Sequence, residues 1–320
     1  MSRDKYSSGD GYMYVYLLSI VACVVVALVV ALMVFGSGLF KKPNPSGPVD
    51  NNSSGATPSQ PDNEISGFLG NESEPSRFTL ASVDNSEVNN GLLILVNADN
   101  RYAFPAETDM VNLYASLKDS NVSFSGSGLY LNATAAKSLK AMCEAFYAET
   151  GLNSGVLVHD AYLSYEKALE KEGADIAGAS DYHIGNSVRL MAWPSKVGTI
   201  GEGTFSWFLD NCYSYGFILR YPEGKDAITS HASHKGIYRY VGVCHAYYMY
   251  KNNLCLEEYL ELLKQYTPEE PLIIDVQNKS YEVYYQPMED GLTSGINVPN
   301  DSAYLISGNN YDGFIITVTG

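Results

Sequence analysis

The stretch "NCYSYGFILRYPEGKDAIT", residues 211–229, gives the clearest fold signal in this chain of 320 residues. Its first part completes a helical pattern that begins at Thr204 and ends at Gly216, because glycine commonly terminates helices. The apolar run "FILRYP" follows directly and is typical of a strand. The stretch therefore predicts a helix that leads into a strand.

Patterns on both sides of this stretch predict a mixed α+β fold. The segment "NATAAKSLKAMCEAFYAETG" begins with a cap-like Asn132 or Thr134, has apolar residues at helical spacing and ends at Gly151. An amphipathic helix is predicted at "CLEEYLELLKQY", residues 255–266, and a strand at "GLLILVNADN", residues 91–100. The tail changes character, since "PLIIDV", "SYEVYYQ" and "DGFIITV" predict strands separated by turns. Helices thus come first, and a β-rich end follows.

The N-terminal region predicts a membrane anchor. The run "MYVYLLSIVACVVVALVVALMVF", residues 13–35, holds no charged residue and is long enough to cross a ~30 Å hydrocarbon core as a helix. A cleaved signal peptide fits less well, because the run is too long and no A-x-A site follows it. We interpret residues 13–35 as one transmembrane helix through which the chain contacts the membrane. Residues 36–85, rich in Gly, Ser, Pro and Asn, are predicted to be a disordered linker.

Charge and cysteine content limit the classes of function. The net charge of −16 argues against a nucleic-acid partner, because phosphate binding needs a basic face. The cysteines after the predicted membrane helix show no C-x-x-C spacing, which argues against a cysteine zinc site. Two disulfides and buried free thiols both remain open for these residues. They are Cys143, Cys212, Cys244 and Cys255.

Several segments occur in the order found in one family of enzymes. The segments "LILVNADN", "LSYEKALE", "SDYHIGNSVRL", "NCYSYGFILRYPEGKDAIT" and "YRYVGVCHA" resemble VanY-like zinc D-alanyl-D-alanine carboxypeptidases, which are LAS-type peptidoglycan peptidases. The resemblance implies an LAS-type D,D-peptidase-like core, an antiparallel sheet with flanking helices, over residues 86–266. A β-rich C-terminal extension then covers residues 267–320, where "YLISGNNYDGFIITV" resembles a tail seen in some of these proteins.

The resemblance also implies a location. Enzymes of this family trim the terminal D-alanine from peptidoglycan stem peptides outside the cytoplasmic membrane. We therefore expect a single-pass protein of the cell membrane with an extracellular C-terminal domain. Residues 1–12 then form a short cytoplasmic N-terminus.

The active-site motifs of the family are altered in this chain. The family binds zinc with a His and an Asp from S-x-H-x-x-G-x-A-x-D and a His from E-P-W-H. The Glu of E-P-W-H is the general base, and an Arg in S-G-Y-R-S-Y holds the substrate carboxylate. At the matching positions Tyr182 and Ile237 replace the two histidines, and Arg189 replaces the aspartate. His234 replaces the glutamate, and Leu163 replaces the arginine.

These replacements change what the site can do. Arginine keeps its proton in proteins and repels a metal ion, and isoleucine has no lone pair. Leucine cannot bind a carboxylate, and tyrosine ligates only as phenolate. We therefore expect no zinc and no other cofactor, and interpret the chain as a non-catalytic relative (a pseudoenzyme) that binds a cell-wall peptide or a surface protein partner. The candidate ligand-binding residues are Ser180, Tyr182, Arg189 and His234, with Arg189 and His234 as an anion-binding pair.

Two other interpretations remain open at this stage. An active zinc D,D-carboxypeptidase requires a rearranged metal site, for which His183, His231 and His234 are the candidates. If Tyr182 and His183 lie on a strand, His183 faces away from the site, which argues against that set. The third interpretation is a purely structural surface protein.

Other charged residues near these motifs have structural interpretations. We expect Asp181 and Glu202 to be surface groups or caps, and Arg220 and Arg239 to be scaffold residues. Ser180 and Cys244, the latter next to His245, are not marked as nucleophiles by any local motif.

Overall fold

A computed structural model of the chain describes residues 76–104, 109–174 and 177–320. The predicted cytoplasmic segment, the predicted transmembrane helix and most of the predicted linker lie outside these residues. Among the described residues, no helix is both long and apolar enough to span a membrane.

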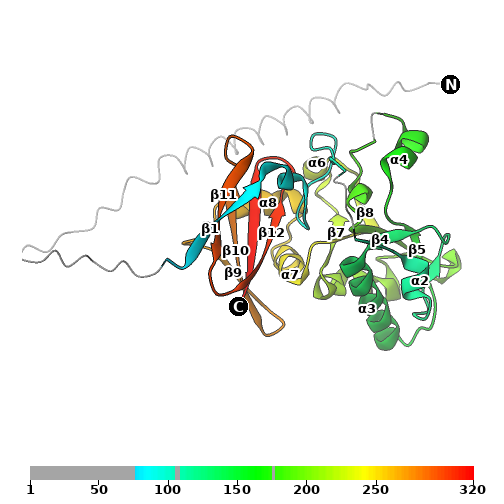
Figure 1. The fold of residues 1–320 in the computed structure, drawn as a ribbon. Coiled ribbons are helices and arrows are strands. Elements are labelled where there is room, and N and C mark those ends of the chain that lie inside the picture. The colour runs from blue at the N-terminus through cyan, green and yellow to red at the C-terminus, as the bar shows by residue number, and fades with distance from the viewer. Residues whose placement is uncertain (1–75, 105–108, 175–176) are drawn as a thin grey trace, which may run out of the picture. The chain divides into compact units, whose positions relative to one another are not determined.

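A five-stranded sheet with flanking helices forms one half of the described part of the chain, on the right in Figure 1. The strand order is β3-β5-β6-β8-β7, and every neighbouring pair is antiparallel except β3 and β5. The predicted α+β class with an antiparallel core sheet and flanking helices is therefore confirmed, with one short parallel edge strand. The strands are β3 (Ser123–Phe124), β5 (Val156–Asp160), β6 (Ser187–Ala192), β8 (His234–Tyr240) and β7 (Phe217–Tyr221).

The longest helix of the described residues, α3 (Ala133–Thr150), has the two ends that the sequence predicts. The Asn132 side chain accepts a hydrogen bond from the backbone of Thr134, and Gly151 ends the helix in the left-handed conformation at φ 71°. Its Phe146 packs against rings from the segment that precedes β7, so α3 belongs to the main core. Shorter elements around it are β2 (Met110–Asn112), α2 (Leu113–Leu117), β4 (Tyr130–Asn132) and α4 (Tyr165–Glu172).

The helix predicted to end at Gly216 is broken into three short pieces. They are η5 (Gly203–Ser206), α5 (Trp207–Asn211) and η6 (Cys212–Tyr215), of which the first and third are 3-10 helices. Gly216 ends them at φ 80°, and a Cβ atom there would lie 2.7 Å from the Tyr240 ring. Glycine is therefore required where the chain turns into β7.

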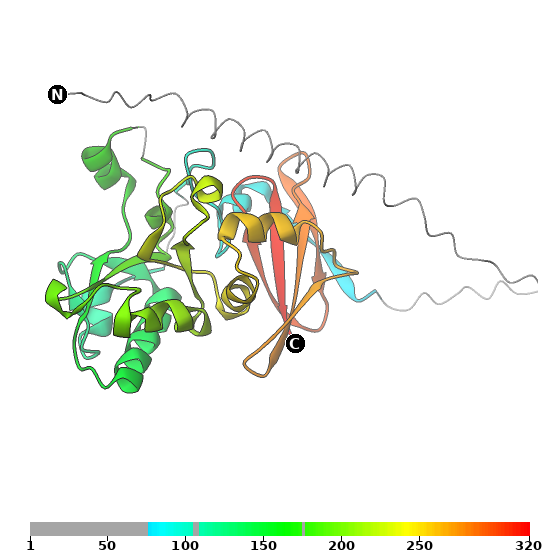
Figure 2. The ribbon, with the colours of Figure 1, turned by 180° about the vertical axis from the view of Figure 1, so that it is seen from behind.

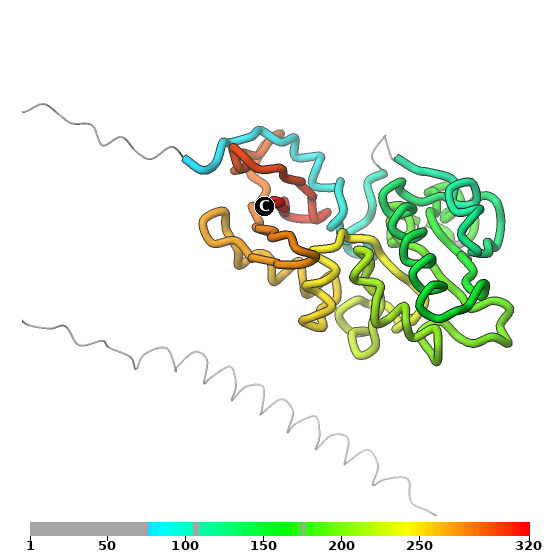
Figure 3. The backbone as a smooth tube through the Cα atoms, turned by 90° about the horizontal axis from the view of Figure 1, so that it is seen from below, coloured from blue at the N-terminus to red at the C-terminus, as the bar shows by residue number. Residues whose placement is uncertain are grey.

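A second β structure, which we name the β module, is built from both ends of the described chain. Strand β1 (Phe78–Asp84) pairs with β11 (Thr293–Pro299), so part of the predicted linker is a strand instead. In Figure 3 this N-terminal segment runs beside the C-terminal strands. Phe78, Ala81 and Val83 of β1 pack against the cluster that contains Tyr284 and Phe314, which explains why the strand forms. The second sheet has the order β12 (Ala303–Gly308), β13 (Gly313–Thr319), β10 (Lys279–Pro287), β9 (Leu272–Val276).

Two helices, α7 (Val243–Lys251) and α8 (Leu256–Leu263), lie between the five-stranded sheet and the β module (Figures 1 and 2). The buried His245 of α7 connects the two helices to each other and to the β module. Its Nδ1 lies 2.9 Å from the Tyr259 hydroxyl of α8, and its Nε2 lies 3.1 Å from Thr317 Oγ1 of β13. Burial lowers the pKa of His245 to about 4, so a neutral imidazole makes this bridge near neutral pH.

The strand predicted at residues 91–100 is not present. The run is buried, yet its backbone bonds to loops and side chains instead of a neighbouring strand: Leu93 N donates to Ser307 Oγ at 2.9 Å, and Leu95 N donates to Asn309 O at 3.1 Å. The Arg239 guanidinium donates to the carbonyl oxygens of Leu92 and Ile94. The apolar pattern of residues 91–100 therefore results from their burial between the core and the β module, and not from hydrogen bonding within a β-sheet.

The cysteines of the described part are buried free thiols, so the second of the two alternatives for them holds. Burial raises the pKa of each thiol to about 12. They act as small apolar core residues. They are Cys143, Cys212, Cys244 and Cys255.

Candidate functional site

One pocket of 640 Å³ brings together the five positions that the sequence comparison above matches to the family's active-site residues. It is lined by the end of β5, the first halves of β6 and β8, and one face of α4. The spacing in the sequence therefore identified residues that meet in space, although they come from four separate segments. These residues are Leu163, Tyr182, Arg189, His234 and Ile237.

A short 3-10 helix, η3 (Asp181–Ile184), positions Tyr182. The Ser180 side chain accepts from the Tyr182 backbone at 3.4 Å, and Gly185 ends the turn at φ 74°. Strand geometry was the basis for expecting His183 to face away from Tyr182, and that basis is wrong. The two side chains still diverge, because the tight helical turn sends His183 into the core.

Strand β6 places Arg189 in the floor of the pocket. In the sheet register Arg189 lies opposite Ile237 of β8 on one side and Asp160 of β5 on the other. Its Nη1 is 3.5 Å from Asp160 Oδ2, which also lies 2.8 Å from His159 Nδ1. Sequence reasoning missed Asp160 and His159, although their place directly after the apolar run "GVLV", residues 155–158, was a usable signal.

Two hydrogen-bond donors of the pocket are buried without a partner in the described part of the chain. They are the Tyr182 hydroxyl and Arg189 Nε. Burial, with the nearby Asp160 carboxylate, raises the pKa of Tyr182, so this residue remains a phenol that can donate. Unpaired buried donors are costly, and a ligand that accepts from them recovers that cost.

His234 is half-buried at the start of β8. Burial, followed by the Arg189 cation, lowers its pKa, so the imidazole is neutral near neutral pH. The Gly236 backbone donates to its Nδ1 at 3.0 Å, which leaves the proton on Nε2. His234 is therefore a third donor on the wall of the pocket.

The pocket is rich in cationic groups although the chain as a whole carries a net charge of −16. Lys167 and Lys171 line it from one face of α4, and Glu166 and Glu170 of the same helix are not among its lining residues. Among the described lining residues the only carboxylate is Asp160, which Arg189 and His159 already contact. Such a lining favours an anionic ligand.

The alternative histidine set does not come together. His183 is fully buried: its Nδ1 donates to Leu163 O at 2.6 Å, and its Nε2 accepts from Gly178 N at 3.0 Å. His231 and His234 do line the pocket, and His231 stacks on Tyr221 with ring centroids 3.8 Å apart. Ser180 caps η3 and is not a lining residue.

The residues at the three positions matched to the family's zinc ligands do not fit a zinc ion. A catalytic zinc needs about three donors with lone pairs, whereas these positions offer a phenol, a guanidinium and an aliphatic side chain. Within the described ranges, no group of three or more His, Cys, Asp or Glu residues is arranged to hold a metal.

Asp181 lies behind the pocket, and the expectation that it is a surface group or a cap is wrong. Its side chain is 2% exposed and lies 2.8 Å from Arg239 Nη1 and 3.1 Å from Arg220 Nε. Burial acts to raise its pKa, but the two guanidinium groups outweigh burial and lower it. Arg220 and Arg239 are buried, as expected of scaffold residues, whereas Glu202 pairs with Lys235 at the surface.

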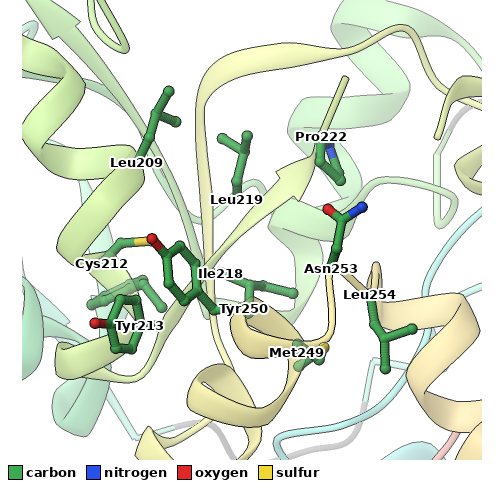
Figure 4. Close-up of a pocket in the computed structure, with 11 residues that line it drawn as sticks. Leu209, Cys212, Tyr213, Ile218, Leu219, Pro222, Met249, Tyr250, Asn253 and Leu254 are labelled. Atoms are coloured by element: carbon green, nitrogen blue, oxygen red, sulfur yellow. The ribbon is translucent and has the colours of Figure 1, made fainter. Parts of the chain in front are cut away.

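Figure 4 shows a different pocket of 210 Å³ between the α5–η6 segment, β7 and α7. In the described part of the chain no charged side chain lines it, so it offers no group for acid, base or anion chemistry. Its lining residues are Leu209, Cys212, Tyr213, Phe217, Ile218, Leu219, Pro222, Met249, Tyr250, Asn253 and Leu254.

Comparison with known proteins gives related sequences and solved structures, while no protein-family model matches the chain. A D-alanyl-D-alanine carboxypeptidase of Enterococcus faecium is 32% identical over 249 residues, which cover 74% of this chain and 78% of the relative. The putative carboxypeptidase YodJ of Bacillus subtilis is 29% identical over 205 residues, covering 58% and 72% of the two chains. The crystal structure of the D,D-dipeptidase VanXYg has a TM-score of 0.64 at 23% identity and covers 77% of this chain and all of its own.

Proposed function

Since the chain belongs to the D-alanyl-D-alanine carboxypeptidase family, we propose that it is a non-catalytic member whose pocket binds the carboxylate end of a peptide. The observation that carries this proposal is a pair of buried donors, Tyr182 Oη and Arg189 Nε, that have no partner in the described part of the chain. The three positions matched to the family's zinc ligands hold tyrosine, arginine and isoleucine. Both atoms are shielded from solvent in the free chain, so a carboxylate accepts from them once the Tyr182 and Arg189 side chains turn toward the pocket.

The contacts around Arg189 support a specific binding mode. Nη1 is held loosely by Asp160 at 3.5 Å, and this leaves the Nε edge of the guanidinium for the ligand. Tyr182 and His234 add neutral donors from η3 and β8. Leu163 and Ile237 supply apolar walls for the aliphatic side chain beside the carboxylate.

The same residues argue against hydrolysis. Position 234 holds a neutral imidazole in place of a carboxylate base, and Asp160, the acid present in the described lining, is held by Arg189 and His159. The Arg189 cation lies opposite Ile237 in the sheet and repels a metal ion at this place. The pocket therefore keeps a place for a peptide end but lacks the groups that would cleave it.

The location and the ligand follow from the same premise. We infer that residues 13–35 anchor the chain in the cell membrane and that the domain after residue 76 faces the cell wall. Its ligand is then a cell-wall peptide, or a surface protein that carries a free C-terminal carboxylate. The support is the long uncharged run in the sequence and the D-alanyl-D-alanine specificity in the name of the Enterococcus faecium relative.

A calorimetric titration of the full chain tests the proposal. The probes are a peptide that ends in D-Ala-D-Ala and the same peptide with an amidated C-terminus. We expect the free acid to bind and the amide to bind at least about tenfold more weakly, because charge-assisted hydrogen bonds contribute about 1.5–3 kcal/mol. Arg189→Ala removes this discrimination, whereas Lys279→Ala, the same charge change on β10, retains it.

Zinc content and D-alanine release are measured on the same sample. Release of D-alanine that stops on chelation would establish the active zinc enzyme instead. Equal affinity for the acid and the amide in the unmodified chain would reject carboxylate recognition.

A further inference from the structure

A second open groove, of 740 Å³, adjoins the pocket. The two share Ser125, Gly126 and His159 in their linings, so one extended ligand can occupy both. We name the groove the aromatic shelf. It is lined by Tyr114, Val122, Ser123, Phe124, Ser125, Gly126, Ser127, Leu157, His159 and Trp193.

The shelf exposes two large aromatic side chains to solvent. Trp193, just after β6, is 53% exposed, and Tyr114 on α2 is 55% exposed. The Tyr114 ring is fixed by an edge contact with Phe124, with centroids 5.8 Å apart. By contrast Trp207 packs on Phe146 and donates to Glu149 at 2.7 Å. Exposed rings held in a groove are typical of binding surfaces.

The polar groups of the shelf limit the chemistry of its ligand. Ser123, Ser125 and Ser127 provide hydroxyl groups, and His159 stands at the junction with the pocket. No Asp, Glu, Lys or Arg is among the described lining residues, in contrast to the cationic pocket beside it. The lining suits a neutral ligand with one flat apolar face and a rim of hydroxyl groups. A phosphate or a nucleotide finds no cation there, and an aliphatic chain leaves the hydroxyl groups unmatched.

We propose that the aromatic shelf binds a neutral sugar ring of a glycan, stacked on Trp193 and Tyr114. The ring presents its C–H face to the aromatic side chains and its hydroxyl groups to the serines. The inference deepens the proposed function, because a glycopeptide that ends in a carboxylate fills the shelf and the pocket together. The sugar contact itself does not depend on Arg189.

The test is a titration of the full chain, handled without glycoside detergents, with a β-1,4-linked N-acetylglucosamine tetrasaccharide. We expect binding that changes tryptophan fluorescence, because Trp193 loses its contact with water. Trp193→Ala and Tyr114→Ala are each expected to weaken binding about tenfold, while Trp193→Phe retains part of the affinity. Tyr304→Ala, which removes a ring of 40% exposure from β12 of the β module, leaves binding unchanged.

Three results would overturn the shelf as a sugar site. They are absence of binding at millimolar tetrasaccharide, unchanged affinity in folded Trp193→Ala protein, and Trp193-dependent binding of a leucine tripeptide amide in place of the sugar. If Arg189-dependent binding of the carboxylate peptide persists in any of these cases, the proposed function stands without the shelf. If the sugar binds and the free-acid peptide does not, the shelf stands and the proposed function fails.

Discussion

Asp181 and Tyr182 are neighbours in η3, which forms part of the pocket wall, yet their side chains lie on opposite sides of it. Asp181 lies on the inner side, in the core, and Tyr182 lies on the outer side, in the pocket. On the inner side, Asp181 accepts from Arg220, Arg239 and Ser187, so both of its oxygens are paired. On the outer side, the Tyr182 hydroxyl is buried without a partner in the described part of the chain. The residues that hold the fold and the residues that line the pocket thus alternate within one segment. Substitutions in the pocket can therefore replace its chemistry and leave the scaffold intact.

The largest effect is expected when the zinc ligands of the family are introduced at the matching positions of the pocket. The triple substitution Tyr182→His, Arg189→Asp and Ile237→His restores three residues with lone pairs at positions that line one pocket. We expect about one zinc ion per chain, with micromolar or tighter affinity, equivalent to about 8 kcal/mol or more. Metal analysis after dialysis and a competitive zinc titration measure this.

Two comparisons control the rebuilt site. The unmodified chain reports adventitious metal, and a version with Ile237→His left out lacks one ligand and should bind far more weakly. Failure of the folded triple variant to retain zinc would mean that the three positions do not converge as the register of β6 and β8 requires.

The next largest effect is a difference in stability between substitutions of two aspartates, Asp181 in the core and Asp160 in the pocket. Asp181→Ala leaves two buried guanidinium groups facing each other, which is expected to cost about 3–5 kcal/mol of folding free energy. That corresponds to a drop in melting temperature on the order of 10 °C. Asp160→Ala removes a carboxylate that is 43% exposed, and the expected change is below about 1 kcal/mol. Similar melting temperatures for the two variants would remove the distinction between scaffold and pocket.

What the sequence could predict depends on how local each cause is. The ends of α3 were predictable, because Asn132 and Gly151 act on their own helix. Strand β1 was not, since its partner β11 lies more than 200 residues away and its own composition continues that of the linker. Residues 91–100 gave the apolar pattern of a strand, but distant groups such as Arg239 determine how that backbone is bonded.

The candidate site also has features that the sequence could predict and features that it could not. The five altered positions were predictable from motif spacing, because the motifs fix which residues face the pocket. The buried donors without partners, and the pairing of Asp181 with two arginines, follow from three-dimensional neighbours that spacing alone does not reveal. The charge of Asp181 suggested a surface residue because neither arginine is near it in the sequence.

A smaller effect compares two tyrosine hydroxyl groups: that of Tyr182 is buried without a partner in the described part of the chain, and that of Tyr284 is paired. Tyr182→Phe removes an unpaired hydroxyl, so we expect the free energy of unfolding to rise by about 1 kcal/mol. Tyr284→Phe removes a hydroxyl that donates to Asn297 O at 2.7 Å, and should lower it by about the same amount. Denaturation of both variants measures the two signs. The interpretation of Tyr182 as a ligand donor also requires that Tyr182→Phe bind the carboxylate peptide more weakly; a loss of stability with unchanged binding contradicts it.

The smallest effect is a pH dependence of peptide binding, which we expect to come from His234 in the pocket. In the free protein, burial and then Arg189 lower the pKa of His234. A bound carboxylate stabilises the protonated imidazole, so the pKa of His234 is higher in the complex and binding takes up protons. Affinity should therefore rise as pH falls through the range between these two pKa values, by roughly threefold to tenfold. It declines again as the peptide carboxylate is protonated.

Substitution of single histidines assigns this pH dependence to its source. His234→Gln should bind the peptide with nearly constant affinity from pH 7.5 down to the range where the carboxylate is protonated, because it keeps a neutral donor and loses the titrating group. His159→Gln and His231→Gln, which replace the other imidazoles lining the pocket, should retain the slope. If the slope survives in His234→Gln and vanishes in one of these two, the anion is held nearer the mouth of the pocket than Arg189, and the proposed pair of Arg189 and His234 is wrong.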